Sequence, residues 1–272
     1  MIFTLNEEVN LPYCLASLDG FDDVIVVDSY SSDRTEQISR EAGVRFFQHE
    51  FTGFGDQRNW ALGNCQPRYE WVLILDADER VTPELANEIA STAASVPQDI
   101  AAFRLLRKFY LWSKWLKHSS LYPNWVVRLV RCGRVRYMNR GHAETQEVQG
   151  EIGELQHALI DENHKSMEEW LRRQATYAAR EAEYELANQA VFSFSELMNR
   201  DPMVRRKAVK RLSWNLPARG WFYFFYAYVV RGGILDGQEG YRFCRMKALY
   251  QNMIVTHKFD LQKRTAAERL SQ

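Results

Sequence analysis

The stretch Trp71-Val-Leu-Ile-Leu-Asp-Ala-Asp-Glu-Arg80 decides the fold of this chain. Residues 71–75 are an uninterrupted apolar run, too short for a helix and typical of a strand buried on both faces. Asp76 and Asp78 follow at its carboxyl end, where open α/β sheets bind ligands. Alternate residues of an extended segment point the same way, so we expect both carboxylates to converge on one object. A divalent cation that bridges to phosphate would relieve their mutual repulsion.

The same two aspartates also fit a simpler interpretation. The aspartates would then be two solvated carboxylates at the end of a strand, or the cap of the helix that opens at Thr82-Pro83-Glu84. Short motifs of this kind occur by chance, so the pair alone does not decide between a ligand site and a solvated strand end.

The remainder of the amino-terminal half alternates between strands and single helices, a pattern that favours βαβ units and a mainly parallel sheet. Asn10 is the expected cap of the first helix, and Pro12 fits its first turn. We expect strands over residues 1–5, 23–28, 44–48 and 71–75. We expect four helices: the first begins after residue 10, the second follows the polar turn at 29–33 and ends near residue 42, the third spans 56–64, and the fourth spans about 83–94.

The pattern changes after residue 94. Strands are predicted over 101–108, 125–130 and 135–138, in an antiparallel or mixed arrangement, with an aromatic and basic loop over 109–124. Ser166-Met-Glu-Glu169 is a capping box that opens a long helix. Trp170, Tyr177 and Tyr184 recur every seven residues in that helix, and we interpret them as packing residues.

Composition limits the class of protein. The chain has 272 residues, enough for one large domain or one domain with an extension. Its four cysteines lack C-x-x-C spacing, which indicates neither a zinc site nor a disulfide framework and suits a reducing cytosol. The amino terminus lacks the basic start and long apolar segment of a signal peptide.

The charge is unevenly distributed. The formal net charge is zero, yet residues 200–272 contain 15 Lys and Arg against 5 Asp and Glu. A basic tail on an acidic body favours an anionic partner, either a membrane surface or a nucleic acid. Val204, Ala208 and Leu212 form one apolar face of a helix that is otherwise basic.

The aromatic run Trp221–Val230 follows that basic helix. It is too short to cross a bilayer as a helix, which takes about 20 residues. Aromatic residues flanked by Arg219 and Arg231 suit the headgroup interface of an anionic membrane, which we favour. The alternative is a buried helix that packs on the catalytic domain or on a second subunit. Nucleic acid fits less well, because the aromatic residues are contiguous instead of interleaved with basic ones.

The order of four motifs resembles the inverting glycosyltransferases of family 2, which have the GT-A fold. The motifs are Thr4-Leu-Asn-Glu-Glu8, Val26-Val-Asp-Ser-Tyr-Ser-Ser-Asp-Arg-Thr35, Gln57-Arg-Asn59 and Leu75-Asp-Ala-Asp-Glu-Arg80. The closer likeness is to the bacterial branch that builds lipopolysaccharide core and exopolysaccharide. It extends through Tyr122-Pro-Asn124, Arg128-Leu-Val-Arg131, His142-Ala-Glu144 and the basic region from Pro202, and so covers nearly the whole chain.

The resemblance implies a fold and a division of the chain. We expect an α/β chain of the GT-A class, with a Rossmann-like, mainly parallel sheet flanked by helices, an antiparallel acceptor-side portion and a helical carboxy-terminal extension. The catalytic domain would span residues 1–163, with a nucleotide half over 1–100 and an acceptor half over 101–163. Residues 164–272 would form the helical extension, associated with a membrane or a second subunit.

The resemblance also implies roles for individual residues. Asp78, with Asp76 beside it, would bind Mg²⁺ or Mn²⁺ and so stabilise the diphosphate leaving group. Asp28 would hold the base of the nucleotide, and Arg58 would meet the base or the diphosphate. The predicted nucleotide-sugar pocket comprises Thr4, Asn6, Glu7, Asp28, Ser29, Arg58, Asp76, Ala77, Asp78 and Arg128.

Inversion requires one general base that takes the proton of the acceptor hydroxyl. The candidates outside the nucleotide half are Glu144, His142, Asp161 and Glu162. Glu144 fits best, because it follows the strand-rich acceptor half and the family has a glutamate nearby. Arg128 and Arg131 would contact an anionic acceptor or the diphosphate.

The expected function is therefore transfer of a sugar from a nucleotide sugar, with a UDP-sugar favoured, to a lipid-linked or lipopolysaccharide acceptor in bacterial cell-envelope synthesis. The enzyme would be a hexosyltransferase, cytoplasmic and peripheral on the cytoplasmic face of the inner membrane, with no nucleic-acid partner and with a homodimer as an alternative partner.

Three other functions share parts of the pattern. A haloacid-dehalogenase-type phosphatase also has an apolar strand before Asp-x-Asp, but its motif has Thr or Val at the position where this chain has Arg80. A nucleotidyltransferase usually carries a glycine-rich basic loop after its first strand, whereas residues 6–8 are acidic here. A non-enzymatic membrane-surface module would explain the tail but not the three carboxylate clusters.

Overall fold

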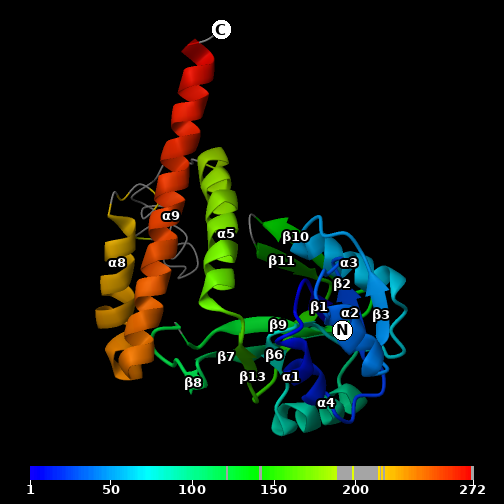
Figure 1. The fold of residues 1–272 in the computed structure, drawn as a ribbon. Helices are drawn as coiled ribbons and strands as arrows, with labels where there is room; N and C mark the ends of the chain where they lie inside the picture. Colours follow the sequence, from blue (N-terminus) through cyan, green and yellow to red (C-terminus); the bar gives the residue numbers. More distant parts are fainter. Residues whose placement is uncertain are drawn as a thin grey trace. The chain divides into compact units, whose positions relative to one another are not determined.

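A computed structural model describes residues 1–120, 122–140, 143–188, 198, 214, 216 and 218–270. The chain divides into two compact units, Met1–Lys165 and Ser166–Gln272 (Figure 1). The predicted boundary lies between residues 163 and 164. The basic helix predicted around Val204–Leu212 lies outside the described residues.

The first unit begins with a four-stranded parallel sheet in the order β3-β2-β1-β5. Its strands are β1 (Ile2–Thr4), β2 (Ile25–Asp28), β3 (Arg45–Gln48) and β5 (Leu75–Asp76). The helices α1 (Leu11–Ala16), α2 (Thr35–Glu41) and α3 (Phe54–Asn64) follow β1, β2 and β3 in turn. The predicted βαβ pattern is confirmed.

The deciding stretch contributes to two sheets instead of forming one strand. Its first part, β4 (Trp71–Leu73), runs antiparallel to β9 (Trp125–Arg131), and its second part, β5, runs parallel to β1. The predicted burial on both faces is confirmed, because Val72 and Ile74 lie in one hydrophobic cluster and Leu73 and Leu75 in another. The stretch therefore joins the two halves of the core.

The second sheet has seven strands and contains both parallel and antiparallel pairs. Its main path is β4-β9-β7-β13-β6. The long strand β7 (Ile100–Leu111) pairs antiparallel with β9 and β8 (Lys114–Trp115) and parallel with β12 (Glu151–Glu154) and β13 (Leu159–Glu162). β13 also pairs antiparallel with β6 (Glu79–Arg80). The mixed arrangement predicted after residue 94 is confirmed.

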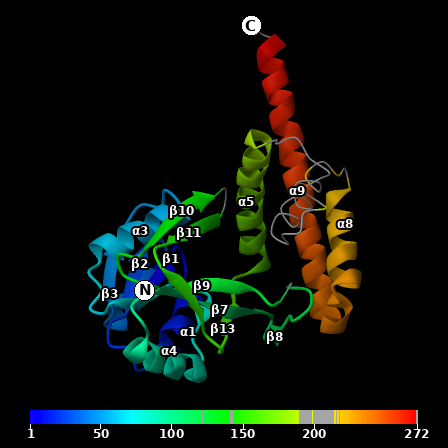
Figure 2. The same ribbon diagram turned by 180° about the vertical axis from the view of Figure 1, so that it is seen from behind.

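A hairpin of β10 (Val135–Arg140) and β11 (Ala143–Val148) packs beside α3 (Figures 1 and 2). The Asn59 side chain joins the two elements, because it donates to the Tyr137 carbonyl at 2.7 Å and accepts from the Tyr137 amide at 2.8 Å. The hairpin is thereby held over the end of the parallel sheet. The predicted α/β fold, with an antiparallel portion after a mainly parallel sheet, is confirmed.

The cap predicted at Asn10 is wrong, and the helix after the two aspartates is capped by Thr82 and not by an aspartate. Thr82 caps α4 (Pro83–Ser95), since its hydroxyl accepts from the Leu85 amide at 3.2 Å. Asn10 stands at the start of α1 but makes no capping hydrogen bond. Its side chain instead donates to Glu7 and accepts from the amide of His164. A tertiary contact has taken the place of the local one.

The regular elements in the described part of the second unit are helices. They are α5 (Met167–Ala187), α8 (Arg219–Phe225), the π-helical segment η1 (Tyr226–Val230), the 3₁₀ segment η2 (Gly233–Asp236) and α9 (Gly237–Leu270). The Ser166 hydroxyl caps α5 by accepting from the Glu169 amide, as predicted. None of the helices within the described ranges is long and apolar enough to cross a membrane.

A small core and a buried charge cluster hold α5 and α9 together. Ala178 and Ala182 pack against Tyr250 and Ile254, with Tyr177 at the edge, which fits the packing role predicted for the aromatic stripe. The fully buried Glu185 accepts from Arg219 at 2.7 Å and from Lys258 at 3.1 Å.

Candidate functional site

The carboxyl ends of β1 and β2 bring together the first group of predicted residues. Asp28 is completely buried, and its carboxylate accepts from the Thr4 hydroxyl and the Ser31 amide, each at 2.8 Å. The Ser29 hydroxyl accepts from the side-chain amide of Gln57 at 2.8 Å. Asp28 therefore fixes the loop after β2 through hydrogen bonds within the protein.

The loop after β1 is held by the loop after β2. Asn6 has a positive φ of 54°, which asparagine tolerates better than most residues. Its side-chain oxygen accepts from the Ser32 amide at 2.8 Å, and its own amide donates to Ser31. The Glu7 amide donates to the Thr35 hydroxyl at 2.8 Å. The two predicted nucleotide-binding loops thus form one hydrogen-bonded rim at the sheet edge.

Asp76 lies between two arginines. Its two carboxylate oxygens accept from Arg58 at 2.8 Å and from Arg128 at 2.6 Å. Desolvation acts to raise the pKa of Asp76, but Arg128, Arg58 and Arg107 outweigh it and hold this pKa well below its usual range. The positive charge expected beside Asp76 is therefore supplied by guanidinium groups.

Asp76 and Asp78 contact different neighbours in this structure, and their convergence on one ligand stays a prediction. The extended segment ends at Asp76, and residues 77 and 78 form a turn before β6. The alternation rule for strands does not apply across a turn. Asp76 therefore faces Arg58 and Arg128, whereas Asp78 faces Asn163, and Ala77 between them is buried in the core.

Two further carboxylates lie beside this cluster. The completely buried Glu79 accepts from Arg128 at 2.6 Å, and desolvation followed by the nearby Asp76 raises its pKa despite Arg128. The Asp161 carboxylate on β13 lies 3.3 Å from Arg107. Burial is the largest effect on Asp161 and, with Asp78, Glu79 and Asp76 adding to it against Arg107, raises its pKa to about 7.

Glu144, the predicted base, is ion-paired with Arg58. The same Arg58 contacts Asp76, and its guanidinium lies 5.6 Å from the ring centres of both Phe3 and Tyr137. The Glu144 side chain is 13% exposed, so its carboxylate is held near Asp76 without being sealed from solvent. His142, another candidate base, lies outside the described residues.

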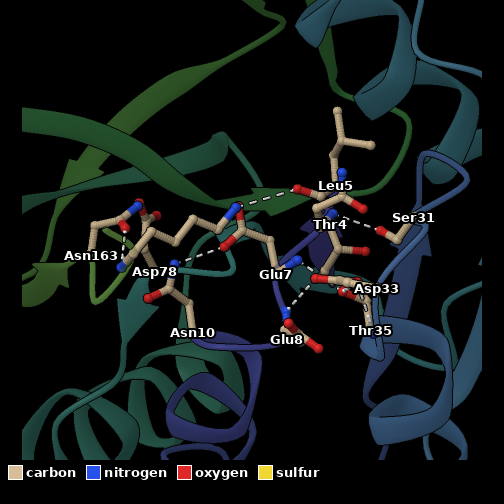
Figure 3. A network of polar contacts seen from close by, with 12 residues as sticks. Thr4, Leu5, Glu7, Glu8, Asn10, Ser31, Asp33, Thr35, Asp78 and Asn163 are labelled. Carbon is tan, nitrogen blue, oxygen red and sulfur yellow. Dashed lines mark hydrogen bonds and ion pairs between the residues drawn. The ribbon is translucent and has the colours of Figure 1, made fainter. Parts of the chain in front are cut away.

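Asp78 is held in the turn by the end of β13. Its side chain accepts from Asn163 at 2.8 Å, and its carbonyl accepts from the Glu162 amide at 2.9 Å. Figure 3 shows Asp78 and Asn163 facing each other, near Asn10 and Glu7. Desolvation followed by the charge of Asp78 raises the pKa of Glu7, against the opposing effect of Lys165. Asp78 and Glu7 therefore belong to one electrostatic cluster.

The Asp78 carboxylate offers oxygen atoms, which Mg²⁺ and Mn²⁺ prefer as ligands, while the neighbouring Asn163 presents its NH₂ group to that carboxylate. Within the described ranges, no three His, Cys, Asp or Glu side chains form a metal-binding group. A cation that keeps its waters and bridges to phosphate needs only one or two carboxylates from the protein. Asp78 fits that arrangement, whereas both oxygens of Asp76 already accept from arginine.

Sequence reasoning missed four residues of this site. Glu79 follows the Asp-x-Asp motif directly, and Arg107 lies in a strand that was predicted without a functional role. Asn163 and Lys165 lie in a short polar turn between β13 and α5. That polar turn was the available signal, but its partners are distant in sequence and only the fold brings them close.

Several known proteins are similar in sequence to this chain. The family model described as Glycosyl transferase family 2 matches residues 1–154. The lipopolysaccharide core biosynthesis glycosyltransferase LpsC of Rhizobium meliloti is 32% identical over 142 residues, which cover 50% of this chain and 51% of LpsC. The uncharacterized glycosyltransferase RT0209 of Rickettsia typhi is 36% identical over 99 residues, which cover 36% of this chain and 33% of that protein. The chain thus spans about half or less of the length of these relatives.

Solved structures show more distant likenesses. S. aureus TarS 1–349 in complex with UDP-GlcNAc is 16% identical with a TM-score of 0.42, and the match covers 90% of this chain and 89% of that one. Glucosyl-3-phosphoglycerate synthase from Mycobacterium tuberculosis, in complex with Mn²⁺, UDP and glucosyl-3-phosphoglycerate, is 14% identical with a TM-score of 0.40. That match covers 66% of this chain and 77% of the other.

The raised pKa of Asp161 gives a prediction for stability. An aspartate in an unfolded chain has a pKa of about 4, whereas that of Asp161 is about 7 in the folded chain. The folded state therefore holds this proton more tightly, and its stability falls as the pH rises through this interval. Asp161→Asn removes the titration, so its thermal midpoint should fall less than that of the wild type between about pH 5 and about pH 8. Calorimetric melting of both proteins measures this difference.

The matched control is Asp99→Asn, which alters an exposed aspartate of the same unit. Its melting temperature should follow the wild-type pH dependence. Parallel curves for Asp161→Asn and the wild type would contradict the raised pKa.

Proposed function

The chain belongs to glycosyl transferase family 2, and from that membership we propose that it transfers a sugar from a nucleotide-sugar donor to a hydroxyl acceptor with inversion. One observation carries the proposal. Asp28 and Asp76 end β2 and β5, the two parallel strands that flank β1, and Asp78 lies in the turn after β5; all three fall within the matched residues 1–154. This edge of an open α/β sheet is where ligands bind. Membership of this family excludes the phosphatase alternative and leaves no reason to favour a non-enzymatic module.

The donor would lie against the rim formed by the loops after β1 and β2. Thr4, Asn6, Glu7, Asp28 and Ser29 would shape the nucleotide end of the pocket, and Asp78 would hold the divalent cation. When bound, Mg²⁺ or Mn²⁺ would stabilise the negative charge that develops on the leaving diphosphate. We take UDP-sugars as the favoured donors.

The arginine cluster would serve the diphosphate end of the donor. Arg58 and Arg128 are nearly buried, and their contacts to Asp76 and Glu79 fix their guanidinium groups in place. Fixed donors that need no reorganisation are effective at stabilising developing charge. Asp76 and Glu79 would therefore act mainly by orienting these arginines and by balancing their charge.

Two carboxylates are suitable as the general base. We propose Glu144, because Arg58 holds it beside the donor cluster while part of the side chain remains exposed. Asp161 is the rival, because its pKa of about 7 lies close to a working pH near neutrality. If Glu144 is the base, Glu144→Gln should lose sugar transfer; if Asp161 is the base, Asp161→Asn should lose it.

The acceptor proposal rests on the relative from Rhizobium meliloti, which is named for lipopolysaccharide core biosynthesis. Its likeness covers half of this chain. We therefore propose a lipopolysaccharide or other lipid-linked glycan acceptor in the bacterial cell envelope. A lipid-linked acceptor would require the enzyme to work at a membrane surface.

The second unit offers a surface for such contact. The helix formed by α8 and η1, continued by η2, exposes apolar side chains at helical spacing. Trp221 is 64% exposed and Val230 63%, and Phe222, Phe225, Tyr226, Val229, Ile234 and Leu235 are exposed with them. Exposed aromatic residues in a cation-rich tail suit an anionic bilayer interface. We propose peripheral binding at the cytoplasmic face of the inner membrane.

The first test of the function removes the proposed cation ligand. Asp78→Ala should reduce sugar transfer from UDP-sugars by at least about two powers of ten, because several kcal/mol of charge stabilisation are lost. Release of UDP from a panel of UDP-sugars in the presence of Mn²⁺ measures this. Asp99→Ala, which changes an exposed aspartate, should keep wild-type activity. Full activity of Asp78→Ala, or of the wild type in excess chelator, would contradict the cation assignment.

A second test concerns the base. Glu144→Gln keeps the shape of the side chain and removes the proton acceptor, so transfer should fall by about two to four powers of ten while donor affinity changes little. Glu147→Gln, on the same strand but exposed, is the control. Asp161→Asn and His142→Ala complete the comparison with one donor and one acceptor. Normal turnover by Glu144→Gln together with a loss in one of these two would assign the base to that residue.

The membrane proposal predicts salt-dependent binding to vesicles that contain phosphatidylglycerol. Binding should weaken as salt rises, because salt screens surface charges. Trp221→Ser combined with Phe225→Ser should weaken binding by about tenfold or more, because burying one aromatic side chain contributes roughly 1.5–3 kcal/mol. Phe259→Ser removes an aromatic residue of α9 that is 58% exposed and should have little effect. Vesicle binding that does not depend on lipid charge would instead favour a protein partner. Loss of a dimer in the double variant would favour the same conclusion.

A further inference from the structure

We propose that the turn Asn163-His164-Lys165 is a positioning element of the donor site. In this proposal Asn163 orients the Asp78 carboxylate toward the divalent cation, and Lys165 holds the Glu7 carboxylate at the nucleotide rim. The inference rests on the proposed function, because it concerns the binding of a cation and a nucleoside diphosphate at that site. Neither Asn163 nor Lys165 belongs to the motifs from which the family was recognised.

The orientation of Asn163 is set by two partners. Its side-chain oxygen accepts from the Lys165 amide at 2.9 Å, so its NH₂ group must point the other way. That NH₂ group donates to one carboxylate oxygen of Asp78 at 2.8 Å. The hydrogen bond restrains the rotation of the Asp78 side chain, and in this proposal the second oxygen is the one that binds the cation. Groups that orient a metal-binding side chain in this way commonly change metal affinity by 10- to 100-fold.

Lys165 connects the same turn to the loop after β1. Its ammonium group donates to a Glu7 carboxylate oxygen at 2.8 Å and lies 3.5 Å from the Leu5 carbonyl. The side chain of Lys165 is 2% exposed and that of Glu7 is 12% exposed. A buried cation beside a partly exposed carboxylate holds that carboxylate in one position, because separating the charges in a dry environment is costly.

Asn10 closes the network from the other side. Its NH₂ group donates to the second oxygen of Glu7 at 2.7 Å, and its side-chain oxygen accepts from the His164 amide at 2.8 Å. Each of the three residues of the turn therefore makes a hydrogen bond toward the candidate site. Figure 3 shows Asn163 beside Asp78, and Asn10 beside Glu7. The turn joins the loop that follows β1 to the turn that follows β5.

This arrangement explains how one carboxylate can serve a cation site. Asp78 lacks the second aspartate that the Asp-x-Asp motif predicted, because Asp76 is held by arginines. Asn163 gives the remaining carboxylate a fixed direction without adding negative charge. Lys165 offsets the charge of Glu7 through their 2.8 Å ion pair. The local charge thus suits one cation accompanied by a diphosphate.

The experiment measures binding with the full chain, MnCl₂ and UDP. Isothermal titration gives the affinity for UDP at fixed Mn²⁺, and electron paramagnetic resonance of free Mn²⁺ gives the affinity for the metal at fixed UDP. The variants are Asn163→Leu, Lys165→Met and the conservative Lys165→Arg. The control is Asn64→Leu, which breaks the 2.7 Å hydrogen bond from Asn64 to the Trp60 carbonyl in the same unit but outside the site.

We expect Asn163→Leu to weaken Mn²⁺ binding in the presence of UDP by about 10- to 100-fold. Lys165→Met should weaken UDP binding by about tenfold, and Lys165→Arg should restore most of it because the charge remains. The number of binding sites per folded chain should stay at the wild-type value in all four variants. Asn64→Leu should bind both ligands like the wild type.

The outcomes separate the two proposals. Wild-type binding of UDP and Mn²⁺ with unchanged affinities in Asn163→Leu and Lys165→Met would overturn the positioning role and leave the proposed function intact. The positioning role would also be overturned if the variants bound less ligand only because fewer chains were competent to bind, and if Asn64→Leu showed the same loss. The substitutions would then act on folding. No Mn²⁺-dependent binding of UDP by the wild type would overturn the proposed function itself.

Discussion

The ion pairs of Asp76 with Arg58 and Arg128 are the interaction on which the rest of the site depends. Arg58 also forms an ion pair with Glu144 on the hairpin, and Arg128 also forms one with the buried Glu79. The cluster thereby ties the parallel sheet to α3, β9 and β11. Ion pairs with little solvent around them are costly to break, since an unpaired buried charge costs about 3–5 kcal/mol. The same desolvation strengthens the field that a bound diphosphate would meet.

Hydrophobic packing places this charge cluster. The stretch from Trp71 to Leu75 crosses from one sheet to the other, and its alternate side chains fill two separate hydrophobic clusters. Because the strand is anchored on both faces, the turn that follows it has a fixed position. The position of this backbone places Asp76 beside Arg58 and Arg128 and places Asp78 beside Asn163.

Local sequence signals predicted the fold well where a single short segment decided the outcome. Apolar runs marked β1, β2, β3 and β4, and the Ser166 cap begins α5 as expected. Such signals failed where distant residues competed for the same group. Asn10 bonds to Glu7 and His164 instead of capping α1.

The sequence by itself determined the family, the alternation of strands and helices and most of the candidate residues, because motifs and periodicity are properties of short segments. Only the tertiary structure decided which charges meet. Arg128 and Asp76 are 52 residues apart, and Asn163 and Asp78 are 85 apart. Their contacts depend on strand order and on one turn, and no local pattern records either. The selection of Arg58 as the partner of both Asp76 and Glu144 follows from the packing of α3 against the β10–β11 hairpin.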